Sequence, residues 1–271
     1  MGVSEKKKSR VTCWPLRLNL ISFIFFCVGR AKSGKKKKET MSTCEFDVDR
    51  YPVVVFDVET TGLPRRSASA RFPPPHDPAS YAGARIVQMA WQLVDLSTGT
   101  VMCEDSFLVL PSGVWWMSSG AEQTHGLSRP KLEQEGRSLP ECLSAGGFWD
   151  AVGRARMLVA HNLEFDYSVL LSEVLHDPSM RGCAPRLSGV PRHCTMRQTT
   201  NMCALPFPNS SGGRPGQYKW PKLIELHRLL FDGRGFDGAH DALEDVRATT
   251  RCLLELRKRD RQQQSASVKL E

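Results

Sequence analysis

The sequence predicts a single α/β domain in which a mixed β-sheet is flanked by helices. Two observations indicate this class: apolar runs of strand length come first in the chain, and segments with helical periodicity lie between and after them. Residues 50–259 span about 210 positions, enough for one domain with a sizeable core. We therefore divide the chain into a basic N-terminal tail at 1–45, a domain at 50–259 and a polar C-terminal tail at 260–271.

Four strands are predicted from their residue patterns. Val53–Phe56 is an apolar run that fits a strand covered on both faces, and the sequence Thr-Thr-Gly ends it. Residues 85–95 and 100–110 are strand-like stretches joined by the turn Ser-Thr-Gly at 97–99. Residues 157–160 form another short apolar run, so we expect a further buried strand there.

Three helices are predicted in the second half of the domain. Asn162 is placed to cap a helix that runs to about His176, because apolar residues follow it at helical spacing. Two more helices, at 221–231 and from Asp241 to about Arg257, close the domain. The segments 177–191 and 205–216 are rich in Pro and Gly and are expected to be surface loops.

The basic balance of the chain belongs to its tail. The formal net charge is +8, but residues 1–40 hold 11 Lys and Arg against two acids, which leaves 26 Lys and Arg against 27 acids in residues 41–271. Bulk attraction of the domain to a polyanion is therefore weak. We expect it to meet such a partner through local Arg and Lys groups and through bound metal.

The tail itself allows several interpretations. Basic residues at 6–10 precede an apolar run at 18–28, and four lysines follow at 35–38. The run is too short to span a membrane but fits a signal-peptide core, the acid-poor composition fits a mitochondrial presequence, and the lysines fit a nuclear signal. Alternatively, because Met41 precedes the domain, residues 1–40 are an upstream extension that adds nothing to the fold.

The cysteines indicate a reducing compartment. The chain has nine, scattered and without a CxxC pair, which argues against both a disulfide framework and a zinc site. His193 beside Cys194 has no second pair at metal-site spacing. We expect an intracellular protein, with nucleus, cytoplasm and mitochondrion left open.

Two carboxylates stand at the end of the first predicted strand. Asp57 and Glu59 are two residues apart, so their side chains leave the same face of a strand and converge. At about 4 Å and an effective dielectric near 20, two such charges repel by roughly 4 kcal/mol, which favours recruitment of a divalent cation. Ligands that are all oxygen favour Mg²⁺ or Mn²⁺ over Zn²⁺.

Two further acidic positions stand at predicted helix starts. Asp166 lies in the first turn of the helix expected after the strand at 157–160. An acidic residue at a helix N-terminus is by itself more often explained by its favourable interaction with the helix dipole. On a continuous helix His240 and Asp245 would be roughly 140° apart. Asp241 and Glu244 resemble a capping box, which would begin the helix at Asp241 and leave His240 free on the preceding turn, beside Asp245.

The acidic motifs taken together resemble a known family. Asp57 and Glu59 in FDVETTG, Asp166 in HNLEFD, and His240 with Asp245 in HDALED are similar, in order and spacing, to the three motifs of the DEDDh 3′–5′ exonucleases. This family includes bacterial proofreading subunits and ribonuclease T. The resemblance implies a ribonuclease H-like fold, with a five-stranded mixed sheet that contains one antiparallel strand.

The resemblance also implies the chemistry. Family members hydrolyse phosphodiester bonds of DNA or RNA from the 3′ end by a two-metal mechanism and release nucleoside monophosphates. Asp57 would bridge two Mg²⁺ or Mn²⁺ ions, Glu59 and Asp245 would complete one, Asp166 would hold the other, and His240 would be the general base. The resemblance covers about residues 51–257, and Thr-His-Gly-Leu at 124–127 is similar to a turn found in many relatives.

Contacts with the substrate follow by analogy. The backbone of Thr60 and Thr61 and the side chain of Leu63 would hold the terminal nucleotide, with Leu63 stacked on or wedged beneath the last base. Asn162 and Phe165 would line the site. Leu63 and Phe165 are equally explained as core residues and Asn162 as a helix cap.

Other features stay open at this stage. His125 is expected to be structural, and Arg85, Arg197 and Lys222 either touch phosphate or are simply solvated. The loop at 64–83 could be a lid, a selectivity element or an insertion.

The biological role is open as well. The expected partner is a single-stranded or frayed DNA or RNA 3′ end, in proofreading, DNA repair, RNA trimming or oligonucleotide clearance, with any polymerase or repair partner a separate protein. The oligomeric state is unknown. A catalytically silent nucleic-acid-binding or scaffold subunit is the main alternative, and an organelle or membrane anchor that carries the exonuclease as cargo is another.

Overall fold

A computed structural model of the chain describes residues 52–65, 71–208 and 217–268, all within one compact unit, Val48–Glu271. The tail expected at 1–45 lies outside the described residues, as do parts of the loops at 64–83 and 205–216. Within the described ranges, no helix has both the length and the apolar composition that crossing a membrane requires.

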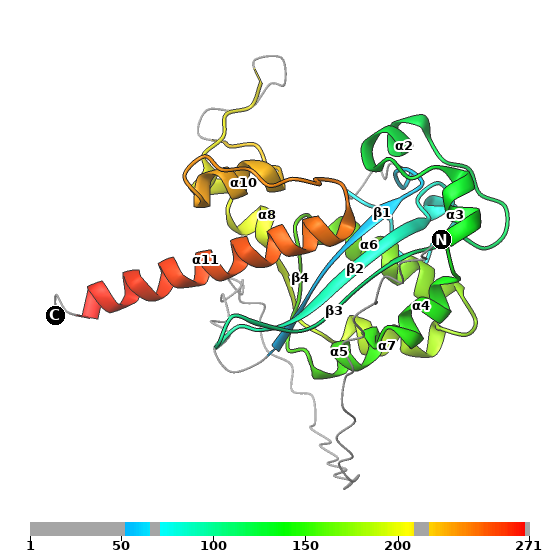
Figure 1. The fold of residues 1–271 in the computed structure, drawn as a ribbon, viewed down its shortest axis with the longest axis horizontal. Coiled ribbons are helices and arrows are strands. Elements are labelled where there is room, and N and C mark those ends of the chain that lie inside the picture. Colours follow the sequence, from blue (N-terminus) through cyan, green and yellow to red (C-terminus); the bar gives the residue numbers. More distant parts are fainter. Residues whose placement is uncertain (1–51, 66–70, 209–216, 269–271) are drawn as a thin grey trace, which may run out of the picture. The chain divides into compact units, whose positions relative to one another are not determined.

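The described residues form a five-stranded sheet in the order β3-β2-β1-β4-β5 (Figure 1). β1 pairs antiparallel with β2 and parallel with β4, β2 pairs antiparallel with β3, and β4 pairs parallel with β5. The sheet is therefore mixed, with β2 opposed to the other four strands, which confirms the predicted arrangement. The strands are β1 (Pro52–Thr60), β2 (Ile86–Asp95), β3 (Thr100–Leu108), β4 (Leu158–Ala160) and β5 (Arg192–Cys194).

Helices cover both faces of this sheet. One cluster of buried side chains joins the sheet to the helices from α4 to α7, and another joins it to α11, which crosses the opposite face in Figure 1. The helices are α1 (Pro78–Tyr81), α2 (Ser119–His125), α3 (Arg129–Glu135), α4 (Leu139–Ala145), α5 (Phe148–Arg154), α6 (Leu163–His176), α7 (Ala184–Ser188), α8 (Thr195–Gln198), α9 (Thr200–Cys203), α10 (Leu223–Leu230) and α11 (Ala242–Val268), with a 3₁₀ turn at Arg181–Cys183.

β1 is buried on both faces because its two sets of side chains meet different layers. Val54, Phe56 and Val58 enter the cluster on the α4 to α7 side. Val53 and Val55 enter the cluster on the α11 side. The strand runs from Pro52 to Thr60, so it extends beyond the predicted apolar run, 53–56, by one residue at the N-terminal end and four at the C-terminal end.

Helices α1 to α5, α8 and α9 were not predicted from the sequence, and the region after α6 also differs from expectation. The predicted loop at 177–191 contains α7 and the 3₁₀ turn, and the three residues after it form the edge strand β5, which was not predicted. β5 has the sequence Arg-His-Cys, without the apolar pattern of a strand, so its pairing with β4 comes from tertiary contact.

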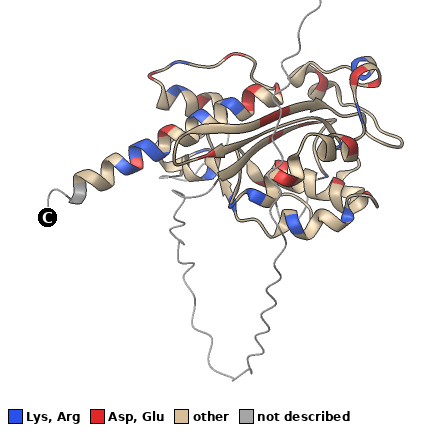
Figure 2. Ribbon diagram, turned by 60° about the horizontal axis from the view of Figure 1, so that its bottom comes forward, with Lys and Arg blue, Asp and Glu red and all other residues tan. Residues whose placement is uncertain are grey.

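The C-terminal boundary also needs correction. Residues 260–268, expected as a polar tail, continue α11. No Gly or Pro interrupts this stretch, and an ion pair of 2.9 Å between Glu255 and Arg259 supports the helix at the point where it was expected to end. Figure 2 shows Lys and Arg gathered on α11 just before its outer end.

Candidate active site

The carboxylates of β1 lie on the α11 face of the sheet. Side chains alternate along a strand, so Asp57 and Glu59 point to the same side as Val53 and Val55. Those two valines pack with residues of α11, including Val246. The apolar contact thus places the start of α11 over the two acids, and the prediction that the pair shares one face is confirmed.

The start of α11 positions the third motif. Asp241 is the residue before the helix, and its Oδ1 accepts hydrogen bonds from the backbone N–H groups of Leu243 at 3.0 Å and Glu244 at 3.3 Å. The predicted cap is therefore present, but its second half is not, because the Glu244 carboxylate pairs with Arg247 at 2.8 Å.

His240 lies outside the helix, as predicted. Its φ is +71°, a left-handed conformation that turns the chain sharply before α11. The His240 backbone N–H donates to Asp245 Oδ2 at 3.2 Å. This bond ties the turn to the first turn of the helix, so His240 and Asp245 face one site although they are five residues apart.

Three side chains meet at ligand distance. Glu59, His240 and Asp245 each offer an atom that lies within 4.8 Å of the others, a grouping that could hold a metal ion. Glu59 comes from β1 and the other two from the start of α11. The structure therefore brings together Glu59 and the His240–Asp245 pair, which begins 181 positions later in the sequence (240 minus 59).

Asp166 reaches the same region from α6. It is buried, and its Oδ1 accepts a hydrogen bond of 3.3 Å from the backbone N–H of Val58. The N–H of Val54, on the same side of β1, bonds the carbonyl of Met157 beside β4. Because β4 ends at Ala160, the Val58 N–H has no strand partner there and Asp166 takes its place.

The charges of the four acids act on one another. Burial, followed by the charges of Asp166, Asp245 and Glu59, raises the pKa of Asp57 well above its usual range. Burial and the charge of Asp245 likewise raise the pKa of Glu59 and, with weaker opposition from backbone hydrogen bonds, that of Asp166. The carboxylates thus form one electrostatic group, with Asp57 inside the range of all the others.

The donor set fits a divalent cation. Asp245 Oδ1 is buried and has no hydrogen-bond partner among the described residues, while its Oδ2 is engaged by His240. A buried carboxylate oxygen without a partner is costly unless a cation completes it. Oxygen donors from Asp57, Glu59, Asp166 and Asp245 suit Mg²⁺ or Mn²⁺.

The residues after β1 are arranged around this edge of the sheet. Thr60 Oγ1 donates to the carbonyl of Gly62 at 2.7 Å. The backbone N–H and C=O of Thr61 are both engaged, with Arg85 and Ser118 respectively at 2.9 Å. Leu63 is 77% exposed, which excludes the alternative that it packs in the core.

Two other predicted substrate contacts lie at the start of α6. Asn162 is the residue before the helix, as expected for a cap, and its φ is +78°. Its side chain makes no hydrogen bond to the first turn, however, so the predicted side-chain cap is absent. Its Oδ1 is buried without a hydrogen-bond partner among the described atoms. Phe165 is half-buried and contacts Phe72, with ring centroids 5.7 Å apart.

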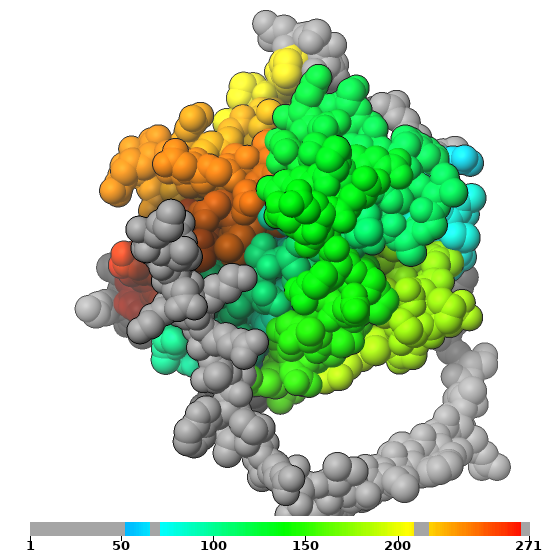
Figure 3. All heavy atoms as spheres, turned by 45° about the vertical axis from the view of Figure 1, so that its right-hand side comes forward, coloured from blue at the N-terminus to red at the C-terminus, as the bar shows by residue number. Residues whose placement is uncertain are grey.

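His125 contacts the backbone at the end of β1, at the residue after Glu59. Its Nδ1 accepts from the Leu127 N–H at 3.0 Å, so the Nε2 at 3.3 Å from the Thr60 carbonyl is the protonated nitrogen. Gly126 follows with φ of +71° and ends α2. The charge of His240 also acts on His125, and Figure 3 shows the green segment that contains α2 against the orange segment that leads into α11.

Gln88 is a site-building residue that the sequence reasoning missed. It lies opposite Glu59 in the β1–β2 pairing, and its side-chain amide bonds both Asp241 and the backbone of Ala242. Gln88 and Gln92 are the two polar residues in a strand that is otherwise apolar from Ile86 to Val94. This pair of buried amides, four residues apart on the α11 face, was the available signal.

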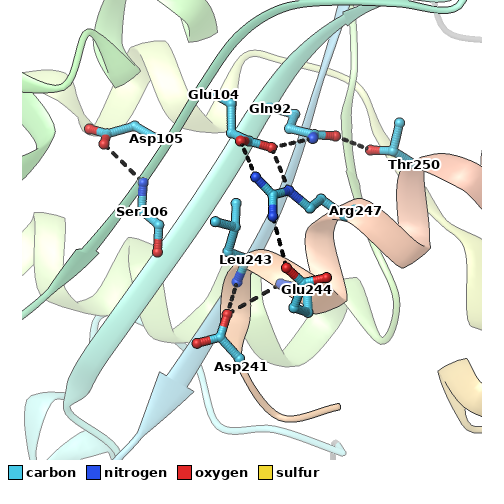
Figure 4. Close-up of polar contacts among 9 residues, drawn as sticks. All are labelled: Gln92, Glu104, Asp105, Ser106, Asp241, Leu243, Glu244, Arg247 and Thr250. Atoms are coloured by element: carbon cyan, nitrogen blue, oxygen red, sulfur yellow. Dashed lines mark hydrogen bonds and ion pairs between the residues drawn. The ribbon is translucent and has the colours of Figure 1, made fainter. Parts of the chain in front are cut away.

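Gln92 and its neighbours form a second anchor for α11 (Figure 4). Arg247 of α11 forms a two-pronged ion pair with Glu104 of β3, at 2.6 and 3.0 Å. Gln92 donates to Glu104 and accepts from Thr250, both at 2.6 Å. These contacts hold α11 against β2 and β3 on the C-terminal side of Asp245, which precedes Arg247 by two residues.

The chain resembles solved structures in its fold, but it has no match among family models and no significant match among curated protein sequences. A zinc-bound complex of E. coli exonuclease I with single-stranded DNA matches with a TM-score of 0.52 and 20% identity, over 78% of this chain and 41% of that one. A complex of the same enzyme with a dT13 oligonucleotide gives 0.55 and 18%, over 80% and 43%.

A moderately thermophilic exonuclease I from Methylocaldum szegediense also matches, with a TM-score of 0.53 and 21% identity over 77% of this chain and 41% of that one. The chain therefore spans less than half the length of these solved structures. Together with the strand order and the antiparallel β2, the likeness shows that the fold is the ribonuclease H-like α/β fold with a five-stranded mixed sheet.

Proposed function

We propose that the protein is a metal-dependent 3′–5′ exonuclease of the DEDDh type. One observation carries the proposal: Glu59, His240 and Asp245 meet within 4.8 Å at the edge of a sheet, and the charges of Asp57 and Asp166 act on the same group. This arrangement lies on a fold shared with exonuclease I, which supports a nuclease over other metal-dependent hydrolases.

The residues take distinct roles in this proposal. Asp57, whose pKa responds to the charges of the other acids, would help to hold the cations together with Glu59 and Asp245, and Asp166 would contribute a further oxygen ligand. When bound, Mg²⁺ or Mn²⁺ ions lower the pKa of an attacking water and neutralise charge on the phosphate. His240, exposed beside Glu59 and Asp245, accepts the proton of that water through a ring nitrogen.

The substrate is a single-stranded or frayed 3′ end of DNA or RNA, and the products are nucleoside monophosphates. Exposed Leu63 supplies an apolar surface for the terminal base, and Asn162 and Phe165 lie at the start of the helix that carries Asp166. Roles in proofreading or DNA repair would need a separate partner protein. The protein is proposed to act inside the cell, in the nucleus, cytoplasm or mitochondrion.

The test uses the full-length protein with matched single-stranded DNA and RNA, each labelled at the 3′ or the 5′ end. Incubations with Mg²⁺, Mn²⁺ or EDTA are run beside Asp57→Ala. The expected result is metal-dependent shortening from the 3′ end that the variant lacks. Wild-type behaviour of Asp57→Ala would show that the site is wrongly assigned, and no cleavage of any substrate would favour a silent binding subunit.

A further inference from the structure

Cationic and aromatic side chains gather beside the acid site, at the ends of β4 and β5. We name this group the Trp220 platform: Arg71, Phe72, Phe165, Arg197 and Trp220. Phe165 follows β4 at the start of α6, Arg197 follows β5 in α8, and Trp220 precedes α10. Figure 1 shows α8 and α10 next to each other on one side of the start of α11.

The members of the platform contact one another through their rings and guanidinium groups. The guanidinium of Arg71 lies 4.0 Å from the ring centroid of Trp220 and 5.1 Å from that of Phe72. Arg197 lies 5.9 Å from the Trp220 centroid and pairs with the carboxylate of Glu164. These contacts hold several flat groups together, although they come from four separate segments of the chain.

The platform faces solvent. Trp220 is 46% exposed even with Arg71 stacked on it, and Arg71 and Arg197 are both exposed. An indole of this size normally buries most of its surface, so a Trp left nearly half exposed is more informative than a single exposed aliphatic residue. Two guanidinium groups against the one carboxylate of Glu164 leave an excess of positive charge.

The segment that carries Trp220 is fixed to the sheet. His161, directly after β4, is half-buried, and its Nε2 donates to the carbonyl of Pro221 at 2.9 Å. Its Nδ1 accepts from Thr195 Oγ1 at 3.0 Å, at the start of α8. One imidazole thus links the end of β4, the beginning of α8 and the residue after Trp220, so the platform has a defined place relative to the acids.

The position of the platform relative to the acids indicates the path that a bound nucleic-acid strand would follow. β1, β4 and β5 are parallel neighbours, so their carboxyl ends lie along one edge of the sheet, where Asp57 and Glu59 also lie. Strands in a sheet are about 4.8 Å apart, which places the end of β5 about 10 Å to the side of the acids. A strand whose last phosphate sits at the acids would reach the platform with the nucleotides just before its end.

We propose that the Trp220 platform is a binding site for single-stranded nucleic acid upstream of the scissile bond, where bases stack on Trp220 and Arg71 and phosphates pair with Arg71 and Arg197. This inference rests on the proposed function for its polarity, with the 3′ end at the acids. Stacking on aromatic and guanidinium planes accepts every base, so the platform gives affinity without sequence preference.

The test measures binding of full-length protein to fluorescent single-stranded oligonucleotides of about 12 nucleotides, in EDTA to prevent cleavage, with DNA and RNA as separate arms. Trp220→Ala is expected to raise Kd about tenfold, which corresponds to about 1.4 kcal/mol. Trp220→Phe, which retains a ring, is expected to lose less. A larger loss for one sugar would identify the preferred nucleic acid.

Arg71 provides a second, independent variant. Arg71→Ala is expected to weaken binding and to make the negative slope of log K against log salt shallower by about 0.7, the value for one phosphate contact on a single strand. Arg71→Lys keeps the charge and so the slope, but loses the planar stacking. Arg129→Ala is the matched control, because Arg129 is also an exposed arginine stacked on a tryptophan, 4.6 Å from the Trp115 centroid, on α3.

The outcomes separate this inference from the proposed function. Unchanged Kd and salt slope in Trp220→Ala and Arg71→Ala, or equal losses in Arg129→Ala, would overturn the platform even if the wild type cleaves DNA or RNA. No detectable binding by the wild type would overturn it as well. Weaker binding by the two platform variants alone supports it, and then cleavage by the wild type, assayed separately, decides the exonuclease.

Discussion

Gln88 Nε2 donates a hydrogen bond of 3.0 Å to Asp241 Oδ2, and Gln88 Oε1 accepts from the Ala242 backbone N–H at 3.2 Å. One side-chain amide thus hydrogen-bonds both the capping carboxylate of Asp241 and the backbone N–H of the first residue of α11. Because Gln88 lies opposite Glu59 across the β1–β2 pairing, the contact sets the distance between Glu59 and the turn that carries His240. Gln88 is therefore a positioning residue for the candidate site.

The first prediction concerns this amide. Gln88→Ala leaves the Asp241 carboxylate and the Ala242 N–H without their partner, at an expected loss of about 1–3 kcal/mol in the free energy of unfolding. We also expect weaker Mn²⁺ binding, since the start of α11 is no longer fixed to β2. Urea unfolding and calorimetric titration with Mn²⁺ measure the two effects.

Gln92→Ala is the matched control for this variant. Gln92 is also buried on the same strand face, but its partners are Thr250, farther along α11 from the acids, and Glu104 of β3. It should destabilise the fold by a similar amount and leave Mn²⁺ affinity nearly unchanged. Equal losses of Mn²⁺ affinity in the two variants would mean that Gln88 acts only through general stability.

The second prediction separates two roles for His240, whose ring lies at ligand distance from Glu59 and Asp245. As a general base, His240→Ala should lower single-turnover cleavage by about 10²- to 10⁴-fold and leave Mn²⁺ affinity within a few-fold of wild type. Asp245→Ala should abolish both cleavage and tight Mn²⁺ binding. If His240→Ala loses Mn²⁺ affinity to the same extent, His240 is a metal ligand and the proposed proton acceptor is wrong.

The sequence predicted the local structure around the candidate site better than it predicted the periphery. Asp57, Glu59 and the separation of His240 from its helix follow from local rules, strand alternation and an N-terminal cap, and these rules operate in the structure. The approach of Asp166 to Val58 depends on where β4 ends. That contact is tertiary, so only the resemblance to a family indicated that Asp166 joins the group.

Two of the missed features, β5 and the Trp220 platform, depend on tertiary contact. β5 is three residues long and polar, and it exists because β4 offers an open edge. The Trp220 platform joins residues from four segments through stacking, which leaves no periodic trace in the sequence. The extension of α11 past Arg257 was missed for another reason, because a polar helix without a buried face looks like a tail.

The third prediction concerns metal-free stability. Burial and the neighbouring acids raise the pKa of Asp57 above its ordinary value near 3.8. The folded protein therefore holds its proton more tightly than the unfolded chain does, so this contribution to stability is present below about pH 4 and is lost as the pH rises through the raised pKa. In EDTA, we expect the unfolding free energy to fall between acidic and mildly alkaline pH.

Asp57→Asn tests this effect directly. Removing one charge from the group should raise stability in EDTA at pH 8 by about 1–2 kcal/mol, allowing for partial solvent screening. The same variant should gain less stability than wild type when Mg²⁺ is added, because a cation site has been weakened. Urea midpoints with and without Mg²⁺ measure both quantities, and a variant less stable than wild type in EDTA would contradict repulsion within the group.

The fourth prediction concerns His161, which joins β4 to α8 and to the segment of Trp220. Burial lowers its pKa from 6.5 to about 4, so the folded protein keeps the ring neutral while the unfolded chain takes up a proton. Its contribution to stability is therefore present above pH 6.5 and is lost as the pH falls toward 4, by up to about 3 kcal/mol.

The site acids change the unfolding free energy in the opposite direction over the same pH range. The informative quantity is therefore the difference in unfolding free energy between wild type and His161→Gln at each pH. The glutamine amide can still donate and accept but does not titrate. The stability advantage of the wild type should shrink as the pH falls from about 7.5 to 4.5, with a slope approaching about 1.4 kcal/mol per pH unit for one proton. Parallel urea-midpoint curves for the two proteins would show that His161 is protonated without unfolding, and the anchor of the Trp220 segment would then need another explanation.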